Sequence, residues 1–252
     1  MMNVVEEIYR RNNMRDPVKE NRRKRPVLSM RESIRKLNSM KMIGLVAEFK
    51  RSSPSGFTAP PDLSLKKYFS GIPAGNIGGI SILTEPDYFL GSYGDIEACQ
   101  DLNLPILVKD FISTTEMIDS SFNSGGDCVL LISDFLDHKI LSALYDHALS
   151  LGMDVLVEFH DAPSASGLDS FEKAIIGYNR RNLRNLKMEP DPEGIDAIMK
   201  INNMRILESG LNRTNISSGI LKGFNGVLVG SSILSGEDVP QRLENMEFEE
   251  YV

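Results

Sequence analysis

Residues 43–56, with the sequence IGLVAEFKRSSPSG, decide the fold. The first five are apolar, as expected of a buried strand, and two charged residues, Glu48 and Lys50, follow two positions apart. Side chains two apart on a strand point to the same face, so a carboxylate and an ammonium leave the end of a buried strand together. A polar turn at residues 52–56 comes next. This pattern is typical of an α/β active site, and equally of a structural ion pair that closes one end of a barrel.

The chain then repeats short apolar runs, separated by stretches that are mostly long enough for a helix. Strands that are apolar on both faces belong to a buried parallel sheet, whose neighbouring strands need crossover connections. We therefore predict an α/β fold, a (β/α)8 TIM barrel formed as a single domain by residues 1–252. A doubly wound sheet is the rival, but residues 50–56 match neither a dinucleotide-binding glycine motif nor a P-loop. The predicted strands are residues 43–47, 77–83, 106–108, 128–132, 155–157, 174–176, 204–207 and 226–229.

Helices between these strands are predicted from capping patterns and apolar spacing. Ser113 and Glu116 form a capping box that opens one helix, and residues 137–150 form a clear amphipathic helix. Residues 161–171, after the fifth strand, contain a proline, a glycine and several serines, so we expect only a short or frayed helix there. The apolar faces of the predicted helices are marked by Ile140, Leu141, Leu144 and Ala148, by Ile195, Ile198 and Met199, and by Ile216, Ile220 and Leu221.

Two further helices are predicted ahead of the barrel, as an N-terminal extension over residues 2–38. The apolar residues of 2–14 fall on one helix face. Ser29 and Glu32 form a capping box that opens a helix over about residues 30–38. The basic stretch at residues 19–25 lies between them in a segment broken by two prolines, and we interpret it as a solvated linker.

The composition limits the possible partners. With 28 basic and 35 acidic residues the net charge is −7, which disfavours nucleic acid but allows a local basic pocket. No apolar run approaches the roughly 20 residues of a membrane span, and the charged N-terminus is not a signal peptide. Cys99 and Cys128 lie in apolar settings, so we expect two buried, reduced thiols in a cytoplasmic protein. No metal site is expected, because His138 and His147 lie in the helix after the fourth strand, away from the strand ends.

Charged residues abut the apolar runs at five of the strand ends, and in a barrel these ends form one mouth. A lysine that is crowded by cations and partly desolvated has a lowered pKa and becomes a usable general acid, so Lys50 and Lys109 are the candidates. Glu158 is the candidate proton acceptor. Glu48 and Glu208 would hold the lysines in place and balance their charge.

Small residues follow the seventh and eighth strands, where barrels of this kind bind phosphate through backbone N–H groups. These residues are Gly210 after the seventh strand, and Gly230, Ser231 and Ser232 after the eighth. Glycine lets the backbone approach an anion closely. Their position makes a phosphate site a better interpretation than a plain turn.

With these residues placed, the chain resembles the indole-3-glycerol phosphate synthase family of tryptophan biosynthesis. The matching segments follow the family order from the first strand to the eighth, and residues 2–38 resemble the family's extra N-terminal helices. The set is highly specific, although no single motif would be. The segments are residues 47–56, 81–85, 88–92, 105–111, 129–132, 156–158, 179–183, 208–210 and 229–232.

The resemblance implies a lyase that needs no cofactor or metal. It would close the indole ring of 1-(2-carboxyphenylamino)-1-deoxyribulose 5-phosphate with loss of carbon dioxide and water. By the family pattern Lys109 is the acid of ring closure, Glu158 is the catalytic glutamate and Lys50 is a candidate acid for dehydration, although which lysine serves which step stays open. The other matches are Glu48 and Asn179, which orient lysines and substrate hydroxyls, Ser53, Arg181 and Ser209 at substrate-binding positions, Leu83, Phe89, Phe111 and Leu130 around the aromatic ring, and Gly210, Gly230 and Ser231 at the phosphate.

Three features depart from the family pattern. Asn182 stands where an aspartate is frequent, and Arg181 would be held less firmly if that aspartate buttresses the arginine. Ser52 replaces a frequent basic residue, and the segment after the fifth strand is short and rich in serine. None of these departures removes a matched catalytic position.

Two other functions are weighed against this one. A phosphoribosylanthranilate isomerase-like barrel is disfavoured, because it is expected to carry a cysteine where this chain has Glu48 and Lys50. The intact set of Lys50, Lys109 and Glu158 argues against a catalytically silent, phosphate-binding barrel subunit. We expect a phosphorylated small molecule as the partner, with no nucleic acid and no membrane. A monomer and an association with other enzymes of the pathway both stay open.

Overall fold

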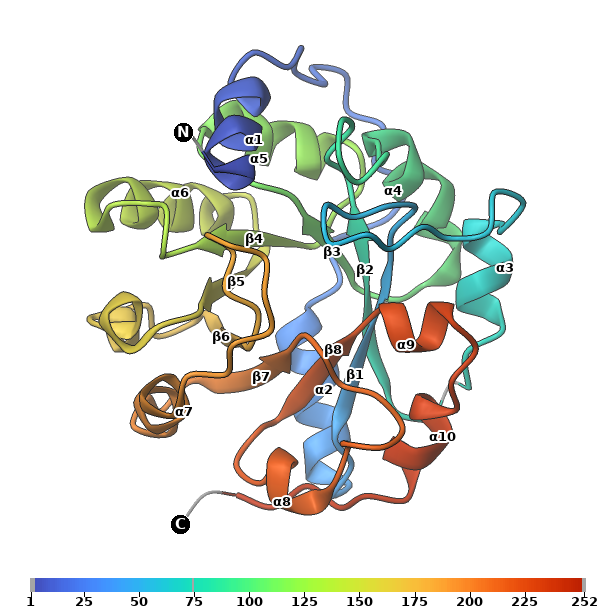
Figure 1. The fold of residues 1–252 in the computed structure, drawn as a ribbon. Coiled ribbons are helices and arrows are strands. Elements are labelled where there is room, and N and C mark those ends of the chain that lie inside the picture. Colours follow the sequence, from blue (N-terminus) through green and yellow to red (C-terminus); the bar gives the residue numbers. More distant parts are fainter. Residues whose placement is uncertain (1–2, 74, 251–252) are drawn as a thin grey trace.

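The strands close into one parallel barrel in chain order, as the computed structural model shows (Figure 1). The structure describes residues 3–73 and 75–250. The barrel closes where β8 pairs with β1, from Gly44 opposite Gly226 to Ala47 opposite Val229. The predicted (β/α)8 barrel is therefore confirmed. The strands are β1 Gly44–Phe49, β2 Ile77–Leu83, β3 Ile106–Lys109, β4 Cys128–Ile132, β5 Asp154–Phe159, β6 Ile175–Asn179, β7 Met204–Glu208 and β8 Gly226–Val229.

Helices surround the barrel and two of them precede it, as predicted. After β5 the chain forms only two 3-10 turns, η2 Ala162–Ala165 and η3 Leu168–Ser170, which confirms the expected short helix. A third turn, η1 Gln100–Leu102, follows α4. The described helices are α1 Val4–Asn12, α2 Met30–Ser39, α3 Leu65–Ser70, α4 Tyr93–Cys99, α5 Thr115–Asn123, α6 His138–Ser150, α7 Pro192–Met199, α8 Ser218–Leu221, α9 Ser231–Leu234 and α10 Val239–Glu244.

Several details of the predicted helices are wrong, and Ile195 and Ile220, which were expected on apolar helix faces, are exposed. The N-cap of α5 is Thr114 rather than Ser113, because the Thr114 side chain accepts the backbone N–H of Met117. Ile140 is 43% exposed, since α6 is rotated so that Leu141, Leu144, Tyr145 and Ala148 form its buried face. Ile216 is buried but precedes α8, which is a single turn. Of the first predicted helix, residue 2 lies outside the described part of the chain.

The two N-terminal helices close opposite ends of the barrel. Met30 and Ile34 of α2 are fully buried, and Ile34 lies against Gly44 and Gly78 near the amino ends of β1 and β2. Val5 and Ile8 of α1 are also buried and line the cavity at the carboxyl ends of the strands. All four join one apolar cluster with side chains inside the barrel, among them Val46, Leu107, Leu130, Leu156, Ile206 and Leu228.

The basic segment between these helices is not a plain solvated linker. Arg23 and Arg25 both form ion pairs with Asp127, at 3.2 and 2.7 Å, and their side chains are only 8% and 11% exposed. The same buried carboxylate accepts the backbone N–H groups of Leu28 and Ile106. A buried charge requires partners of opposite sign, and the two arginines supply them. The segment is thus fixed to the start of β3 and β4.

The two cysteines and the lengths of the helices bear on the expectations from composition. Cys99 in α4 and Cys128 in β4 are both buried and both free thiols, as predicted. Among residues 3–73 and 75–250, no helix is long and apolar enough to cross a membrane.

Candidate active site

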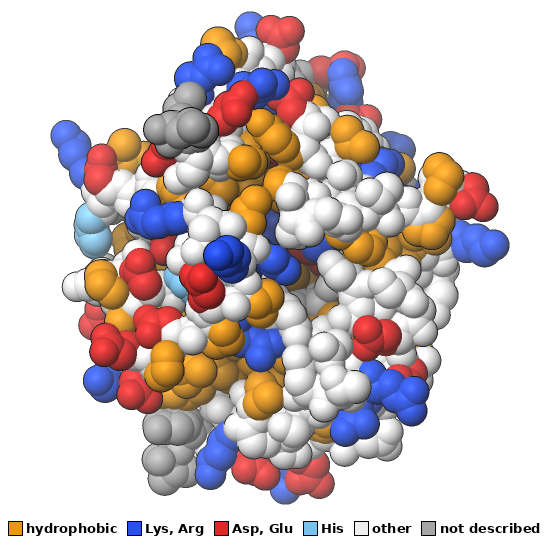
Figure 2. Space-filling model, viewed as in Figure 1, with side chains coloured by type: hydrophobic (Ala, Val, Ile, Leu, Met, Phe, Trp, Pro, Cys, Tyr) orange, Lys and Arg blue, Asp and Glu red, His pale blue; other side chains and the backbone are white. Residues whose placement is uncertain are grey.

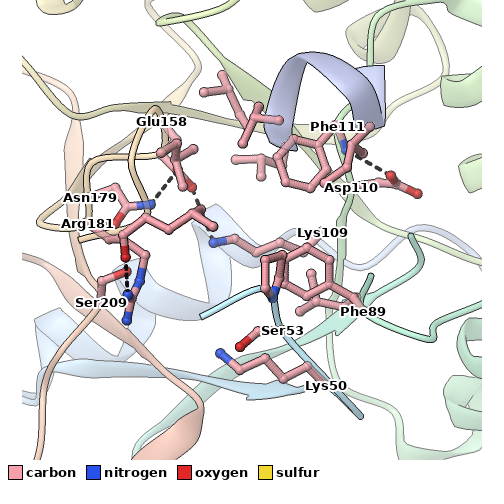
Figure 3. Close-up of a pocket in the computed structure, with 18 of the residues that line it drawn as sticks. Lys50, Ser53, Phe89, Lys109, Asp110, Phe111, Glu158, Asn179, Arg181 and Ser209 are labelled. Carbon is pink, nitrogen blue, oxygen red and sulfur yellow. Dashed lines mark hydrogen bonds and ion pairs between the residues drawn. The ribbon is translucent and has the colours of Figure 1, made fainter. Parts of the chain in front are cut away.

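A cavity opens where the carboxyl ends of the strands meet. Figure 2 shows this face, which is hollowed near its centre with basic and hydrophobic side chains around the opening. The sequence-predicted residues at strand ends converge on this cavity (Figure 3). Those that line it are Glu48, Lys50, Ser53, Leu83, Phe89, Lys109, Phe111, Leu130, Glu158, Asn179, Arg181 and Ser209.

Lys109 is the centre of the site. It is the last residue of β3, and its ammonium nitrogen lies 2.8 Å from Glu208 Oε2, 3.2 Å from Glu158 Oε2 and 3.9 Å from Glu48 Oε2. These three carboxylates come from the ends of β7, β5 and β1, so the barrel brings them together from positions up to 160 residues apart in sequence. The lysine side chain is 13% exposed and the three carboxylates are nearly or fully buried. The predicted charged cup is therefore present.

The expected lowering of the pKa of Lys109 is wrong. Burial by itself lowers the pKa of a lysine, but the attraction of Glu158, of Glu208 whenever it is ionised, and of Glu48 outweighs it and raises the pKa of Lys109 above its ordinary value. The prediction assumed that other cations would crowd the lysine, whereas carboxylates are its nearest charged neighbours. Lys109 is consequently a permanent ammonium at neutral pH.

Glu208 behaves as a protonated acid. Burial, opposed by Lys109 and reinforced by Glu158, raises the pKa of Glu208 to about 8. Two carboxylates that share one site seldom ionise together. Within the described chain, Glu208 Oε1 accepts no hydrogen bond, so a proton on this carboxyl group leaves the least uncompensated charge.

Glu48 and Lys50 point to the same side, as their spacing predicts. Lys50 Nζ lies 2.8 Å from Glu48 Oε1, and Glu48 also faces Lys109. Burial alone would raise the pKa of Glu48, but Lys50 and Lys109 together lower it. Residues 43–56 were interpreted either as the start of an active site or as a structural ion pair. The Glu48–Lys50 ion pair exists and lies inside the cavity, so the two interpretations describe the same structure.

Glu158 is oriented by the end of β6. Asn179 Nδ2 donates to Glu158 Oε1 at 2.6 Å, and Asn179 Oδ1 accepts the backbone N–H of Arg181 at 2.9 Å. Burial lowers the pKa of Arg181, with Glu48 acting in the opposite direction. The Asn182 side chain donates a hydrogen bond to Glu189 and accepts the backbone N–H of Arg184. The Arg181 guanidinium donates instead to the Leu186 carbonyl at 2.7 Å. The departure at Asn182 thus leaves Arg181 anchored by backbone.

One side of the cavity is an apolar wall. The rings of Phe89 and Phe111 pack 6.0 Å apart between centroids, and Leu83 and Leu130 complete the wall. Figure 3 shows the two rings lying across the cavity from Glu158. Such a wall suits a planar aromatic ligand and excludes water from the charged groups.

Sequence reasoning placed Val5 and Ile8 on one face of a helix but did not assign them to the site. Both line the cavity, because α1 lies over the mouth of the barrel. Glu85 was also missed as a positioning group. Its buried carboxylate accepts the backbone N–H groups of Asp87, Tyr88 and Phe89 at 2.7 to 2.9 Å, and so shapes the turn that carries Phe89. An acid two residues after the end of β2 and directly before a proline was the available signal.

The loop after β1 forms another part of the wall. Ser53 lines the cavity, its hydroxyl lies 2.9 Å from that of Ser55, and its backbone N–H donates to Phe57. The Lys50 ammonium lies 5.6 Å from the centre of the Phe57 ring. Ser52, the second departure, donates its backbone N–H to the Phe89 carbonyl and joins this loop to the aromatic wall.

A second hollow adjoins the first at the ends of β7 and β8. Gly210, Gly230 and Ser231 line it, and it shares Lys50, Lys109, Arg181 and Ser209 with the main cavity. Ser209 and Gly210 both adopt left-handed backbone angles, with φ of 65° and 64°. A non-glycine residue in this region stores strain, which is common in ligand-binding loops. A side chain at Gly230 would begin 2.6 Å from Glu48 Oε1, so only glycine fits there.

Together, the two hollows can bind an elongated anion. The small-residue hollow offers backbone N–H groups and nearby cations to one end, and the apolar wall accepts an aromatic group at the other. Between them stand one permanent ammonium and several carboxyl groups of different pKa, which can donate and accept protons. Within the described chain no set of three or more His, Cys, Asp or Glu side chains is arranged to hold a metal ion.

Comparisons with known proteins agree with this geometry. A sequence model of the indole-3-glycerol phosphate synthase family matches residues 2–246. The chain is 44% identical to the indole-3-glycerol phosphate synthase of Picrophilus torridus, over 94% of each chain. It is 38% identical to that of Thermoplasma acidophilum, over 95% of this chain and 97% of the relative. Tryptophan synthase subunit alpha from Legionella pneumophila shares the fold, with a TM-score of 0.58 and 12% identity over 86% of this chain and 94% of that one.

Proposed function

The chain belongs to the indole-3-glycerol phosphate synthase family, and from this we propose that the cavity converts 1-(2-carboxyphenylamino)-1-deoxyribulose 5-phosphate to indole-3-glycerol phosphate. Members of this family are carboxy-lyases. The observation that carries the proposal is the convergence of three buried carboxylates on Lys109, between an aromatic wall and a hollow of small residues.

Substrate binding follows from the shape of the two hollows. The phosphate would lie against Gly210, Gly230 and Ser231, where backbone N–H groups are available. The carboxyphenyl ring would lie against the apolar wall that Phe89 and Phe111 form. Lys50, Arg181, Ser53 and Ser209 line the space that remains for the substrate carboxylate and hydroxyl groups.

Ring closure forms a carbon–carbon bond between the carboxylate-bearing ring carbon and the ribulose carbonyl carbon. The carbonyl oxygen takes the electron pair of its π bond and receives a proton from Lys109. A lysine with a raised pKa fits this step, because the alkoxide that develops is a stronger base than an amine. Before the transfer, the fixed ammonium stabilises the growing negative charge.

Loss of carbon dioxide returns its bonding electron pair to the ring. The hydroxyl formed from the carbonyl oxygen then leaves as water, after protonation by Lys50. Glu158 takes the proton whose removal completes the indole double bond, and Asn179 holds that carboxylate in position at 2.6 Å. Glu48 Oε1 lies 2.8 Å from the Lys50 ammonium and would hold the second lysine in position.

The test is a turnover assay with the purified protein. The carboxyphenylamino-ribulose phosphate, supplied alone in buffer with a metal chelator, is expected to give indole absorbance and fluorescence together with carbon dioxide. A folded protein that produces neither would refute the proposed function. Phosphoribosylanthranilate serves as the second substrate, and its conversion in place of the first would support the isomerase.

A further inference from the structure

We propose that Asp110 and Arg15 are a positioning pair that fixes the direction of Lys109 by joining the segment after α1 to the ends of β2 and β3. This inference rests on the proposed function, since it concerns the acid of that reaction. Neither residue was among the predicted site residues. Asp110 stands between Lys109 and Phe111, both of which line the cavity.

Asp110 is a buried charge with a full set of partners. Its side chain is 0% exposed. One carboxylate oxygen accepts Asn12 Nδ2 at 2.7 Å and the backbone N–H of Phe111 at 2.8 Å. The other accepts Arg15 Nη1 at 2.6 Å and Thr84 Oγ1 at 2.6 Å. A carboxylate held by four donors from three segments has one orientation, and hydrogen bonds to a charged group are the strong ones.

These bonds form a closed circuit around Lys109. The Thr84 backbone N–H donates to the Lys109 carbonyl at 3.1 Å, and the Thr84 carbonyl accepts Arg15 Nη2 at 3.1 Å. The backbone of Lys109 is thus tied to Thr84, Thr84 to both Asp110 and Arg15, and Arg15 back to Asp110. In Figure 3 the bond between Phe111 and Asp110 lies beside Lys109, next to the helix that crosses above Phe111.

The ordinary alternative is that the pair only holds α1 on the barrel. Arg11 in α1 provides a comparison, because its ion pairs are exposed, with Glu7 at 2.6 Å and with Asp87 at 3.1 Å. Exposed pairs contribute little to stability. Arg15, in contrast, is 18% exposed, packs 4.8 Å from the centre of the Tyr93 ring and donates both to Thr84 after β2 and to Asp110 after β3. Loss of Arg11 loosens only the helix, whereas loss of Arg15 also frees the lysine.

The experiment compares Arg15→Ala with Arg11→Ala in steady-state turnover of the carboxyphenylamino-ribulose phosphate, well below the unfolding midpoint of each variant. We expect kcat of Arg15→Ala to fall about tenfold to a hundredfold, with KM changed less than about threefold, because small misplacement of a reacting group is costly. Arg11→Ala is expected to stay within about twofold of wild type in both constants. Millimolar guanidinium chloride should restore part of kcat in Arg15→Ala and none in Asp110→Asn, which lacks the carboxylate that would bind it.

A folded Arg15→Ala protein with kcat within twofold of wild type would overturn the inference, as would an equal loss in Arg11→Ala. If Arg15→Ala does not fold, Arg15→Lys decides: it keeps the charge but lacks the second donor to Thr84, so an intermediate kcat supports the inference and an unchanged one refutes it. An inactive wild-type protein would instead refute the proposed function, which keeps the two failures distinct.

Discussion

Replacing Glu208 with glutamine should remove the alkaline limb of the pH–rate profile. Burial and the neighbouring Glu158 raise the pKa of Glu208 to about 8. When Glu208 ionises, a full negative charge appears 2.8 Å from the Lys109 ammonium. At an effective dielectric constant near 20, this attraction amounts to about 6 kcal/mol. Lys109 then holds its proton more tightly and becomes a weaker acid.

The size of the effect follows from the titration. If only the form with protonated Glu208 turns over, the active fraction falls from about nine-tenths at pH 7 to about one-tenth at pH 9, and kcat/KM falls about tenfold. Glutamine has the same shape and stays neutral, so kcat/KM of Glu208→Gln should be nearly level between these pH values. The free energy of unfolding should also fall as pH rises. A carboxyl group whose pKa is raised in the folded protein stabilises it fully below the ordinary pKa of 4.5, and this contribution is lost as pH rises toward 8.

The assay is initial-rate indole fluorescence in buffers of constant ionic strength from pH 6 to pH 9.5, with both proteins checked for folding at each end. If wild-type kcat/KM rises steadily through pH 8, the claim that turnover requires protonated Glu208 is refuted. An alkaline limb that persists unchanged in Glu208→Gln would show that another group titrates there.

Two other substitutions, one of them with a control, test buried carboxylates that hold neighbouring segments in place. Asp127→Ala leaves two buried arginines without their carboxylate and should lower the free energy of unfolding by about 3–5 kcal/mol in urea denaturation. Asp87→Ala, which removes an exposed ion pair, should change it by less than about 1 kcal/mol, and equal losses would contradict the account. Glu85→Gln weakens the bonds that shape the Phe89 turn and should raise KM about threefold to tenfold, with a smaller change in kcat. An unchanged KM would show that the turn holds without them.

Most of the barrel could be predicted because its signals are local. Each strand is a short apolar run and most runs are bounded by charge or glycine, so the apolar pattern separates strands from crossovers. Boundaries were less accurate where a side chain competes with its neighbour, as at Ser113 and Thr114, either of which can cap a helix. The rotation of α6 that exposes Ile140 depends on packing against the barrel, which a single helix does not encode.

The members of the site were also predictable, because barrel topology gathers residues at strand ends. Their electrostatics were not. The pKa of Lys109 depends on which charges lie within about 4 Å, and Glu48, Glu158 and Glu208 approach it only after the barrel closes. The ion pairs of Asp127 could not be predicted either, because its arginine partners are about a hundred residues away in sequence. Basic residues near prolines resemble a linker until the buried carboxylate they bind is known.

The most direct test of the account is the turnover of Lys109→Ala. The central claim is that Lys109, held by three carboxylates, gives its proton to the ribulose carbonyl oxygen as the ring closes. We expect kcat to fall by more than about a hundredfold while KM changes less than about threefold, as for loss of an interaction made only in the transition state. A folded Lys109→Ala protein with near-normal kcat would contradict the claim and remove Lys109 from the acid role.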